Sequence, residues 1–242
     1  MKVLKIFSLI ILFTSISYAD WIEEAREKTE TELKVLAVDI GKVLGGGFYS
    51  PVRGGGLLSF KIGLQVSSTK ISEETKNLKI FPEGEESIGL GWIYIGKGIP
   101  GGFDFFLRFS KIDVENSSEK ISLFGIGIEY KIIKDRLISL FPGLSILIAG
   151  NTFDSTYIDI KTKTIALKLS KKLPVITPFF SVARDKTEME IDSTIGKLKP
   201  EGSSTRFLLG IQIRAIPFTY IDLSLSKVKD ETGIDLGFGV KF

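Results

Sequence analysis

The stretch that decides the fold reads GIDLGFGVKF and covers residues 233–242. Its even-numbered positions hold large apolar side chains, and its odd-numbered positions hold glycine or a charged residue. A period of two is typical of a β-strand with one apolar and one polar face. A tilted strand of roughly 9–11 residues is long enough to cross the hydrocarbon core of a bilayer. The stretch therefore predicts a membrane-spanning strand, although a soluble β-sandwich could end on the same pattern.

The amino terminus has the pattern of a secretory signal peptide. Lys2 and Lys5 precede an apolar run, residues 6–16, and the small residues Ser17 and Ala19 follow it. The run is shorter than the roughly 20 apolar residues that a spanning helix needs. We therefore predict export of the protein, with residues 1–19 removed by cleavage before Asp20.

Composition excludes several classes of function. Without Lys2 and Lys5 the formal net charge falls from +3 to +1, so the chain lacks the basic excess of a nucleic-acid-binding protein. It contains no cysteine for a disulfide framework and no histidine to act as a general base. Asp222 and Asp235 could support glycosidase chemistry only in an open cleft. We therefore predict no enzymatic activity, no catalytic residue, no metal ion and no cofactor.

Residues 20–47 predict one amphipathic helix, and residues 48–56 predict a glycine-rich linker. Asp20 is a candidate N-cap with Glu23 at the capping-box spacing, and apolar residues recur at steps of three and four. The triplet Gly45–Gly47 is expected to end the helix. It is not a phosphate-binding loop, because no Gly-Lys-Ser/Thr follows it. We expect this helix to plug the β-barrel that the alternating patterns in the rest of the chain predict, as shown below, or to lie at the periplasmic rim of that barrel.

The remaining chain repeats the period of two and predicts ten strands. Proline-containing short connections alternate with longer ones, which we place near 68–86, 113–120, 151–156, 187–203 and 228–232. The fold class is therefore all-β, an antiparallel transmembrane β-barrel over residues 57–242, and its even number of strands places both chain termini on the periplasmic side. Pro178 lies inside the predicted seventh strand and counts against that assignment, because proline lacks a backbone donor. The strands are expected near 57–67, 87–95, 102–112, 124–130, 143–150, 157–170, 175–186, 204–215, 218–227 and 233–242.

The charged residues on the polar faces are expected to line the lumen, since a charge facing lipid costs up to ~2–4 kcal/mol. They either pair with one another as a structural network or form a ring that selects solutes. The lumen is expected to be partly apolar, with Ile93, Phe106, Leu147 and Leu208 on the inward parity. The charged residues predicted in the lumen are Lys61, Asp104, Arg108, Glu129, Lys168, Arg214, Asp222, Asp235 and Lys241.

Three further stretches are distinctive: GGFY at 46–49, IPGG at 99–102 with LRF at 107–109, and LSKKLPVITPF at 169–179. Through them the chain resembles an uncharacterised family of small bacterial outer-membrane barrel proteins. This resemblance implies a fold and a location in the outer membrane, and no activity. The closing strand also resembles the last strand of such barrels, which the barrel assembly machinery reads. By this resemblance the assembly signal would be Phe238, Val240 and Phe242.

These patterns predict an outer-membrane protein whose partners are membrane lipid and the assembly machinery. Its function is predicted to be that of a narrow or plugged channel or transporter for small or apolar solutes. One alternative is a non-conducting barrel that presents its loops or its periplasmic helix to partners. A second alternative is a soluble, lipocalin-like periplasmic carrier, in which the apolar face would point inward. The sequence does not identify a solute.

Overall fold

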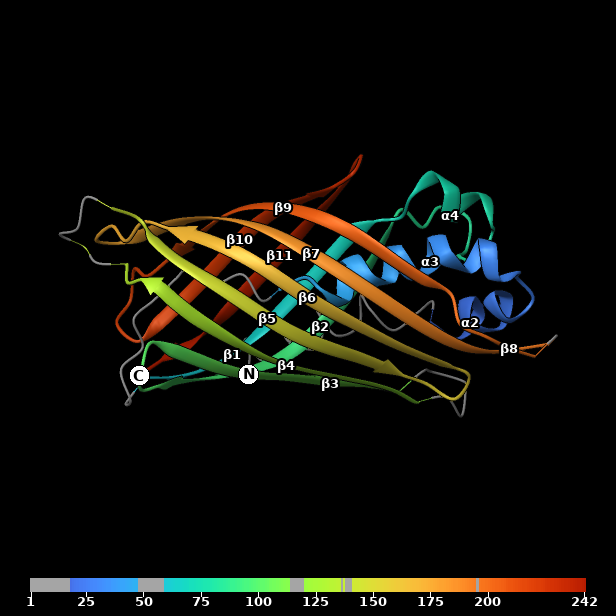
Figure 1. Cartoon of the computed structure of the whole chain (residues 1–242), viewed down its shortest axis with the longest axis horizontal. Helices are drawn as coiled ribbons and strands as arrows, with labels where there is room; N and C mark the ends of the chain where they lie inside the picture. The colour runs from blue at the N-terminus through green and yellow to red at the C-terminus, as the bar shows by residue number, and fades with distance from the viewer. Residues whose placement is uncertain (1–17, 48–58, 114–119, 136, 138–140, 195) are drawn as a thin grey trace, which may run out of the picture.

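Ten long antiparallel strands form a closed barrel in the computed structural model (Figure 1). The structure describes residues 18–47, 59–113, 120–135, 137, 141–194 and 196–242. Within these ranges an additional short strand, β8 (Gly196–Leu198), pairs with the end of β7. The long strands are β1 (Phe60–Lys70), β2 (Ser87–Ile99), β3 (Phe103–Asp113), β4 (Lys120–Ile133), β5 (Gly143–Asp154), β6 (Ile158–Ser170), β7 (Ile176–Ser193), β9 (Glu201–Ile213), β10 (Thr219–Val228) and β11 (Glu231–Lys241).

The last strand closes the barrel against the first. β11 pairs with β1 in a register that runs from Lys61 opposite Lys241 to Thr69 opposite Gly233. Each other long strand pairs with its neighbours along the chain, so the ladder has no open edge. Pro178 lies near the start of β7, where its register partner is Ile211 on β9. The structure thus confirms the predicted antiparallel barrel of ten strands.

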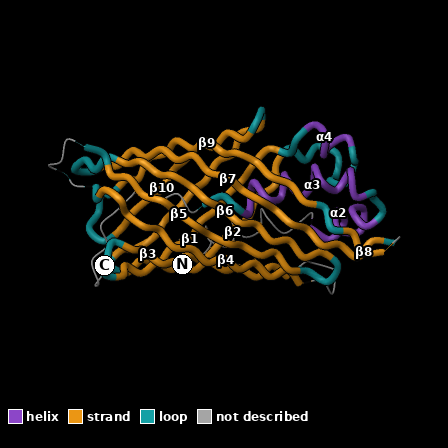
Figure 2. Tube along the Cα trace, viewed as in Figure 1, coloured by secondary structure: helices purple, strands orange, loops and turns teal. Residues whose placement is uncertain are grey.

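The barrel has two distinct mouths, which can be followed in Figures 1 and 2. We call the end where β1 begins and β11 ends the C-terminal mouth; there the backbone N–H of Phe60 donates to the carbonyl of Phe242 at 3.0 Å. We call the opposite end the helix mouth, because α4 (Glu73–Asn77) follows β1 there and the amino-terminal helices lie beside it. The amino-terminal helices therefore do not lie at the mouth that holds the carboxy terminus.

The amino-terminal helical region is two helices rather than the single predicted one. α2 (Tyr18–Arg26) ends before Thr29, and Thr29 begins α3 (Glu30–Leu44) as its N-cap. The hydroxyl of Thr29 donates to Glu32 Oε2 at 2.6 Å and its backbone N–H donates to the same oxygen at 2.8 Å, and these hydrogen bonds hold the pKa of Glu32 below its usual value. The predicted cap at Asp20 is wrong, because Asp20 lies inside α2. The reciprocal capping box is instead at Thr29, where it satisfies the free donors at the start of the longer helix.

The end of α3 follows the prediction. The helix ends at Leu44, and Gly45 occupies its C-cap. Gly47 has a φ of +81°, a conformation that glycine adopts without a steric penalty. The predicted linker at 48–56 lies outside the described residues. Among the residues that are described, no helix is long and apolar enough to cross a membrane.

Several connections predicted as long loops are strand. β7 continues to Ser193, and β9 begins at Glu201, so most of 187–203 is hydrogen-bonded sheet. Met189 and Ile191 point inward and are buried, while charged side chains alternate with them on the outside. The alternation with a period of two continues through this segment, but its apolar residues face the lumen and its charged residues face outward. The sequence did not predict this strand because apolar residues were expected on the outer face.

The exterior of the barrel divides into two regions along its axis. The first is the belt, in which the outward side chains are apolar on every strand; its rim at the C-terminal mouth includes Lys97. The second is the crown, toward the helix mouth, where outward positions become charged, as in Lys161, Lys163 and Lys186. The exposed apolar residues of the belt are Ile62, Ile93, Phe109, Phe124, Ile126, Ile128, Ile146, Ile148, Ile165, Leu167, Leu169, Phe180, Phe207, Leu209, Ile211, Ile221, Leu223, Leu225, Ile234, Leu236 and Phe238.

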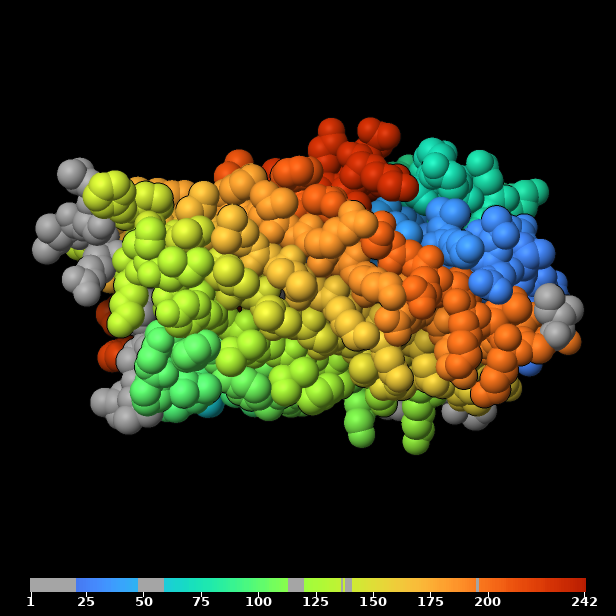
Figure 3. Space-filling view, viewed as in Figure 1, coloured from blue at the N-terminus to red at the C-terminus, as the bar shows by residue number. Residues whose placement is uncertain are grey.

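The interior changes in the opposite sense. In the crown, the apolar sides of α2 and α3 pack against inward apolar residues of the strands in one continuous core. Figure 3 shows the helices (blue) and α4 (teal) filling this end beside β7 and β9 (orange). The core comprises Trp21, Ile22, Ala25, Leu33, Leu36, Ala37, Ile40, Val43 and Leu44 of the helices with Ile71, Ile80, Ile88, Leu90, Trp92, Ile121, Leu123, Phe153, Ile158, Ile160, Met189 and Ile191.

A smaller apolar cluster lies deeper in the lumen. Phe106, Leu147 and Leu208 belong to it, and they point inward at the predicted parity. Ile93 does not; it faces outward, and the predicted parity of the second strand is wrong. Leu90 and Trp92 are buried instead, because they pack against the plugging helices in the crown. The remaining members of this cluster are Tyr94, Ala149, Ala166, Phe179 and Ala183.

Candidate functional site: the plugged lumen

The carboxy-terminal end of α3 reaches into the lumen and is the centre of the candidate site. From Asp39 to Gly47 every residue is buried. The last carbonyls of a helix have no partner within the helix and carry partial negative charge. A cationic hydrogen-bond donor at this end of the helix supplies the missing partner of a carbonyl and offsets the partial negative charge. We call α2, α3 and Gly45–Gly47 together the plug.

Arg108 of β3 supplies the first set of donors. Its guanidinium donates to the carbonyls of Leu44 and Gly46, and to Oδ1 of Asn151 at 2.8 and 3.0 Å. The guanidinium carbon lies 4.0 Å from the centre of the Trp92 ring, a cation–π contact. Gly125, the register partner of Arg108 on β4, leaves room for this side chain: a Cβ there would lie 2.4 Å from Asn151 Oδ1.

Arg206 of β9 holds the same helix end from another side. Its Nη1 donates to the carbonyl of Lys42 at 2.8 Å, and its Nη2 forms a close ion pair with Asp185 of β7. Asp185 also accepts a hydrogen bond from Thr164 at 2.6 Å. A buried charge needs such partners to offset its desolvation. Two strand arginines thus bind α3 through its backbone carbonyls. We call the contacts of Arg108, Arg206 and Asp185 at the end of α3 the seat.

Glycines allow the plug to approach the wall closely. A Cβ at Gly41 would lie 2.0 Å from Thr187 Oγ1, and a Cβ at Gly45 would lie 2.2 Å from Arg206 Nη2. A Cβ at Gly46 would lie 2.8 Å from Asp235 Oδ1. The glycine triplet therefore serves close packing inside a barrel as well as ending a helix.

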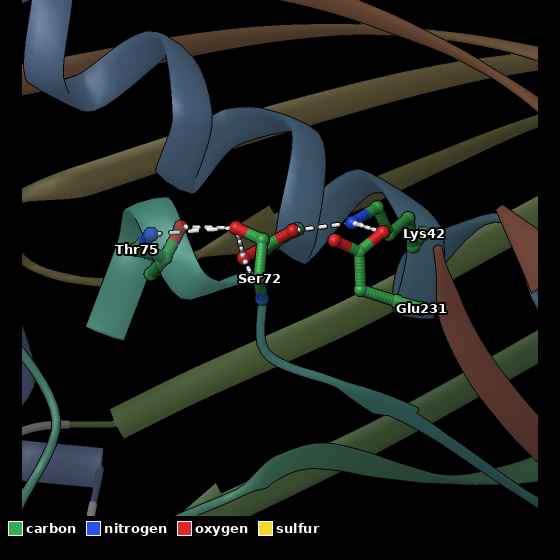
Figure 4. A network of polar contacts seen from close by, with 5 residues as sticks. Lys42, Ser72, Thr75 and Glu231 are labelled. Carbon is green, nitrogen blue, oxygen red and sulfur yellow. Dashed lines mark hydrogen bonds and ion pairs between the residues drawn. The ribbon is translucent and has the colours of Figure 1, made fainter. Parts of the chain in front are cut away.

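A second polar network fastens the plug at the helix mouth, as Figure 4 shows. Lys42 Nζ lies 2.6 Å from Asp39 Oδ1 and 3.1 Å from Glu231 Oε2 at the start of β11. The other carboxylate oxygen of Asp39 accepts from the backbone N–H of Ser72 at 2.9 Å and from its hydroxyl at 2.7 Å. Ser72 is also the N-cap of α4, accepting from the N–H of Thr75. This network, which we call the latch, joins α3 to the β1–β2 and β10–β11 connections.

α2 is fastened separately. The Arg26 guanidinium lies 4.1 Å from the centre of the Tyr157 ring, and its Nε donates to the carbonyl of Asp192 at 3.0 Å. The Arg26 carbonyl in turn accepts from Ser193 Oγ at 2.6 Å and from the N–H of Thr194. The plug is therefore attached to loops or strands at both of its ends.

The lumen beyond the plug holds paired charges. Lys168 lies 2.8 Å from Glu129, and Ser145 donates to the same carboxylate at 2.5 Å. Lys131 lies 2.6 Å from Asp104. A cavity of about 10 Å³ lies beside Gly47, lined also by Gln65, Phe179, Asp222, Ser224, Asp235, Leu236 and Gly237. This volume is about that of a single water site.

The structure places eight of the nine predicted lumenal charges on inward-facing strand positions, and Arg214 lies just after the end of β9. Lys61, Arg108, Glu129, Lys168, Asp222 and Asp235 are buried, and Asp104, Arg214 and Lys241 are partly buried. It brings Glu129 and Lys168 together, and Asp104 meets Lys131, which the sequence reasoning missed. Whether these groups select solutes stays a prediction. Phe238 faces outward in the belt, and Phe242 is exposed at the C-terminal mouth; their role in assembly also stays a prediction.

The sequence reasoning missed several residues of the site. Asp39, Lys42, Asp185 and Arg206 are buried. The two helix residues showed a signal, since both fall among apolar positions of the amphipathic pattern. The sequence carried no such signal for Arg206 and Asp185, because alternation predicts on which face of a strand a side chain lies and not which residue it contacts. Within the described ranges, no group of three or more acidic, histidine or cysteine side chains is placed to hold a metal ion.

Comparison with known sequences identifies a family. Residues 61–242 match a family of unknown function, DUF6588. The chain belongs to this family. The match begins in β1 and covers every long strand, whereas the plug lies before it. No curated protein matches the chain.

Solved structures with some similarity are bacterial barrels. The amino-terminal β-barrel domain of Pseudomonas aeruginosa OprF is 10% identical, with a TM-score of 0.37, and the match covers 74% of this chain and 97% of that one. A loop-deletion mutant of Vibrio cholerae OmpT is 12% identical, with a TM-score of 0.34 and coverages of 85% and 73%. Yersinia pestis Ail is 15% identical, with a TM-score of 0.26 and coverages of 76% and 97%. These values are too low to carry an argument about this chain.

Proposed function

We propose that this protein is an integral barrel of the bacterial outer membrane and works as a narrow channel for small or apolar solutes, gated by its plug. Support for the membrane location comes from the belt, whose outward residues would be costly to leave in water. Aromatic residues at the C-terminal mouth suit the membrane interface, where such residues form girdles. Tyr130 packs against Phe103 there, and Phe218 against Phe242, with ring centres 4.8 and 6.0 Å apart.

The observation that carries the channel proposal is the composition of one wall of the lumen. The inward positions of β10, β11 and β1 are rich in glycine and serine, including Ser67, Ser224 and Gly237, and the small cavity lies along this wall beside Gly47. The plug covers the helix-mouth end of this wall. Because the plug is a separate helical segment, displacing it would open the lumen without breaking a strand ladder.

An engineered disulfide tests the gate. A Cβ at Gly202 of β9 would lie 2.4 Å from Cγ2 of Val38 on α3, which is compatible with the ~3.5–4.5 Å between Cβ atoms of a disulfide. The chain has no native cysteine, so Val38→Cys with Gly202→Cys gives one defined bond. Conductance in planar bilayers is measured on the oxidised and the reduced double variant, with Val38→Cys alone as the control.

We expect the reduced protein and the control to show small, intermittent channels and the oxidised protein to be silent. Equal conductance in both redox states would reject gating by the plug. A protein that inserts into bilayers but conducts in no state would instead support a non-conducting barrel that presents its crown to partners. The continuous apolar core between plug and crown favours this second candidate.

A further inference from the structure

The outward charges that border the belt on the helix-mouth side are mostly basic. Following each strand from the belt into the crown, the first charged outward residue is exposed, and it is acidic only on β5 and β9, at Asp154 and Glu201. β2 and β11 have no charged outward residue at this border. The basic residues in first position are Lys70 on β1, Lys111 on β3, Lys120 on β4, Lys163 on β6, Arg184 on β7 and Lys227 on β10.

The basic residues are densest on β6 and β7. Lys163 stands directly opposite Lys186, and Arg184 stands opposite Ile165 of the belt. Like charges opposite each other in a sheet are destabilising. Two carboxylates offset part of this repulsion: Glu188 lies 3.4 Å from each lysine, and Glu201 of β9 lies 2.9 Å from Lys186. Both carboxylates are on the crown side of the lysine pair, whereas Arg184, on the side toward the belt, has no carboxylate among the hydrogen-bond partners that the structure describes.

Arg184 is held in an extended position on this surface. Its Nη1 donates to Thr205 Oγ1 at 2.9 Å and its Nη2 to Ser203 Oγ at 2.7 Å. Both partners are neutral hydroxyls, so the guanidinium charge is not cancelled. Toward the C-terminal mouth the surface continues into Ile165 and Leu167 of the belt, which are exposed. An arginine fork beside lysines is suited to phosphate oxygens.

We propose that Lys163, Arg184 and Lys186 bind the phosphate groups of an anionic lipid whose acyl chains lie on the neighbouring belt. This inference rests on the proposed membrane location and names a lipid partner for it. Charge complementarity and continuity with the apolar belt select a lipid headgroup rather than a free anion. Basic side chains next to an anionic bilayer surface strengthen binding by an amount equivalent to about fivefold each.

The test uses the full chain in nanodiscs of zwitterionic lipid, with fluorescent diphosphoryl lipid A as the probe. The variant is Lys163→Gln, Arg184→Gln and Lys186→Gln. The matched control, Lys76→Gln, Lys197→Gln and Lys199→Gln, removes three positive charges away from the belt, of which Lys197 and Lys199 are exposed and Lys76 is half-buried. Retained barrel structure is checked for both by heat-dependent migration in gels.

We expect the wild type and the control to bind the probe alike and the variant to bind roughly tenfold to a hundredfold more weakly. Dephosphorylated lipid A should bind all three equally poorly, and millimolar inorganic phosphate should not displace the probe. Equal binding by variant and control would overturn the inference, and so would displacement by phosphate alone. If the wild type fails to enter the bilayer, the proposed membrane location fails as well, which separates the two conclusions.

Discussion

The belt and the crown are built from the same ten strands and have opposite polarity. In the belt, apolar side chains such as Leu209 point outward, and charged residues such as Glu129 and Lys168 pair inside. In the crown, charged side chains such as Lys163 point outward, and Trp92 and Met189 are buried against the plug. The alternating pattern of a barrel strand therefore does not by itself determine which of its faces points into the lumen. What fills the lumen and what surrounds the exterior decide which half of the alternating pattern is buried.

The plug makes this difference possible. The inverted polarity that we considered for a soluble carrier occurs here in one part of a barrel, where helices occupy the space that a ligand would fill. The seat of α3 lies at the transition between the regions, and Arg108 and Arg206 both bind its carbonyls there. We therefore expect the same kind of substitution to have different consequences in the belt and in the crown.

The largest effect is expected from unpairing the buried charge at the seat. Asp185→Ala leaves Arg206 buried without its carboxylate, and removing one partner of a buried pair costs about 3–5 kcal/mol. Arg184→Met, one residue away and exposed, should cost about 0–1 kcal/mol. Urea unfolding followed by tryptophan fluorescence measures the difference, because Trp21 and Trp92 both lie in the crown core. Equal midpoints for the two variants would show that the seat does not stabilise the crown.

The next largest difference between belt and crown is expected from a charge placed on the outer surface. Leu209→Arg puts a cation toward lipid and should cost about 2–4 kcal/mol if the position is near the bilayer centre. Thr152→Arg, outward in the crown, should change the free energy of unfolding by about 0.5 kcal/mol or less. The comparison is made by unfolding both variants from lipid vesicles. A penalty at Thr152 as large as that at Leu209 would extend the lipid-facing surface into the crown.

A smaller effect is expected where α3 touches the wall. Gly41→Ala should gain up to about 1 kcal/mol from helix propensity, but its Cβ would lie 2.0 Å from Thr187 Oγ1 and 2.9 Å from Thr187 Cβ. Overpacking of this kind costs about 1–3 kcal/mol, so we expect net destabilisation. Thr187→Ala should relieve part of the destabilisation, because it removes the hydroxyl and keeps the Cβ, and a double-mutant cycle measures the coupling. A stabilising Gly41→Ala would mean that α3 is not seated against β7.

The smallest effect is expected at the start of α3, outside the wall contacts. Thr29→Ala should cost about 1 kcal/mol of local helix stability through the lost cap. Because the folded pKa of Glu32 is lowered, its contribution is complete above its unfolded pKa and is lost as the pH falls through the folded value. Hydrogen exchange of α3 amides between pH 6 and acidic pH should show this loss in the wild type only. The same loss in Thr29→Ala would assign the pH dependence to another group.

Local sequence determined much of this protein. The period of two gave the strand number, since each strand has its own alternation regardless of distant contacts, and the glycine triplet set the end of α3. Prolines and glycines also marked the connections at the C-terminal mouth.

Only the tertiary structure decided which way each alternation faces. Ile93 and Trp92 exchange inside and outside relative to expectation because Trp92 meets the plug and Arg108. Residues 187–203 became strand because a helix lies inside to bury Met189 and Ile191. The latch and the seat join residues up to 189 positions apart, as Lys42 and Glu231 are. Alternation is a local property of the chain, whereas burial depends on which segments meet, and the position of a helix inside a barrel is fixed by such distant contacts.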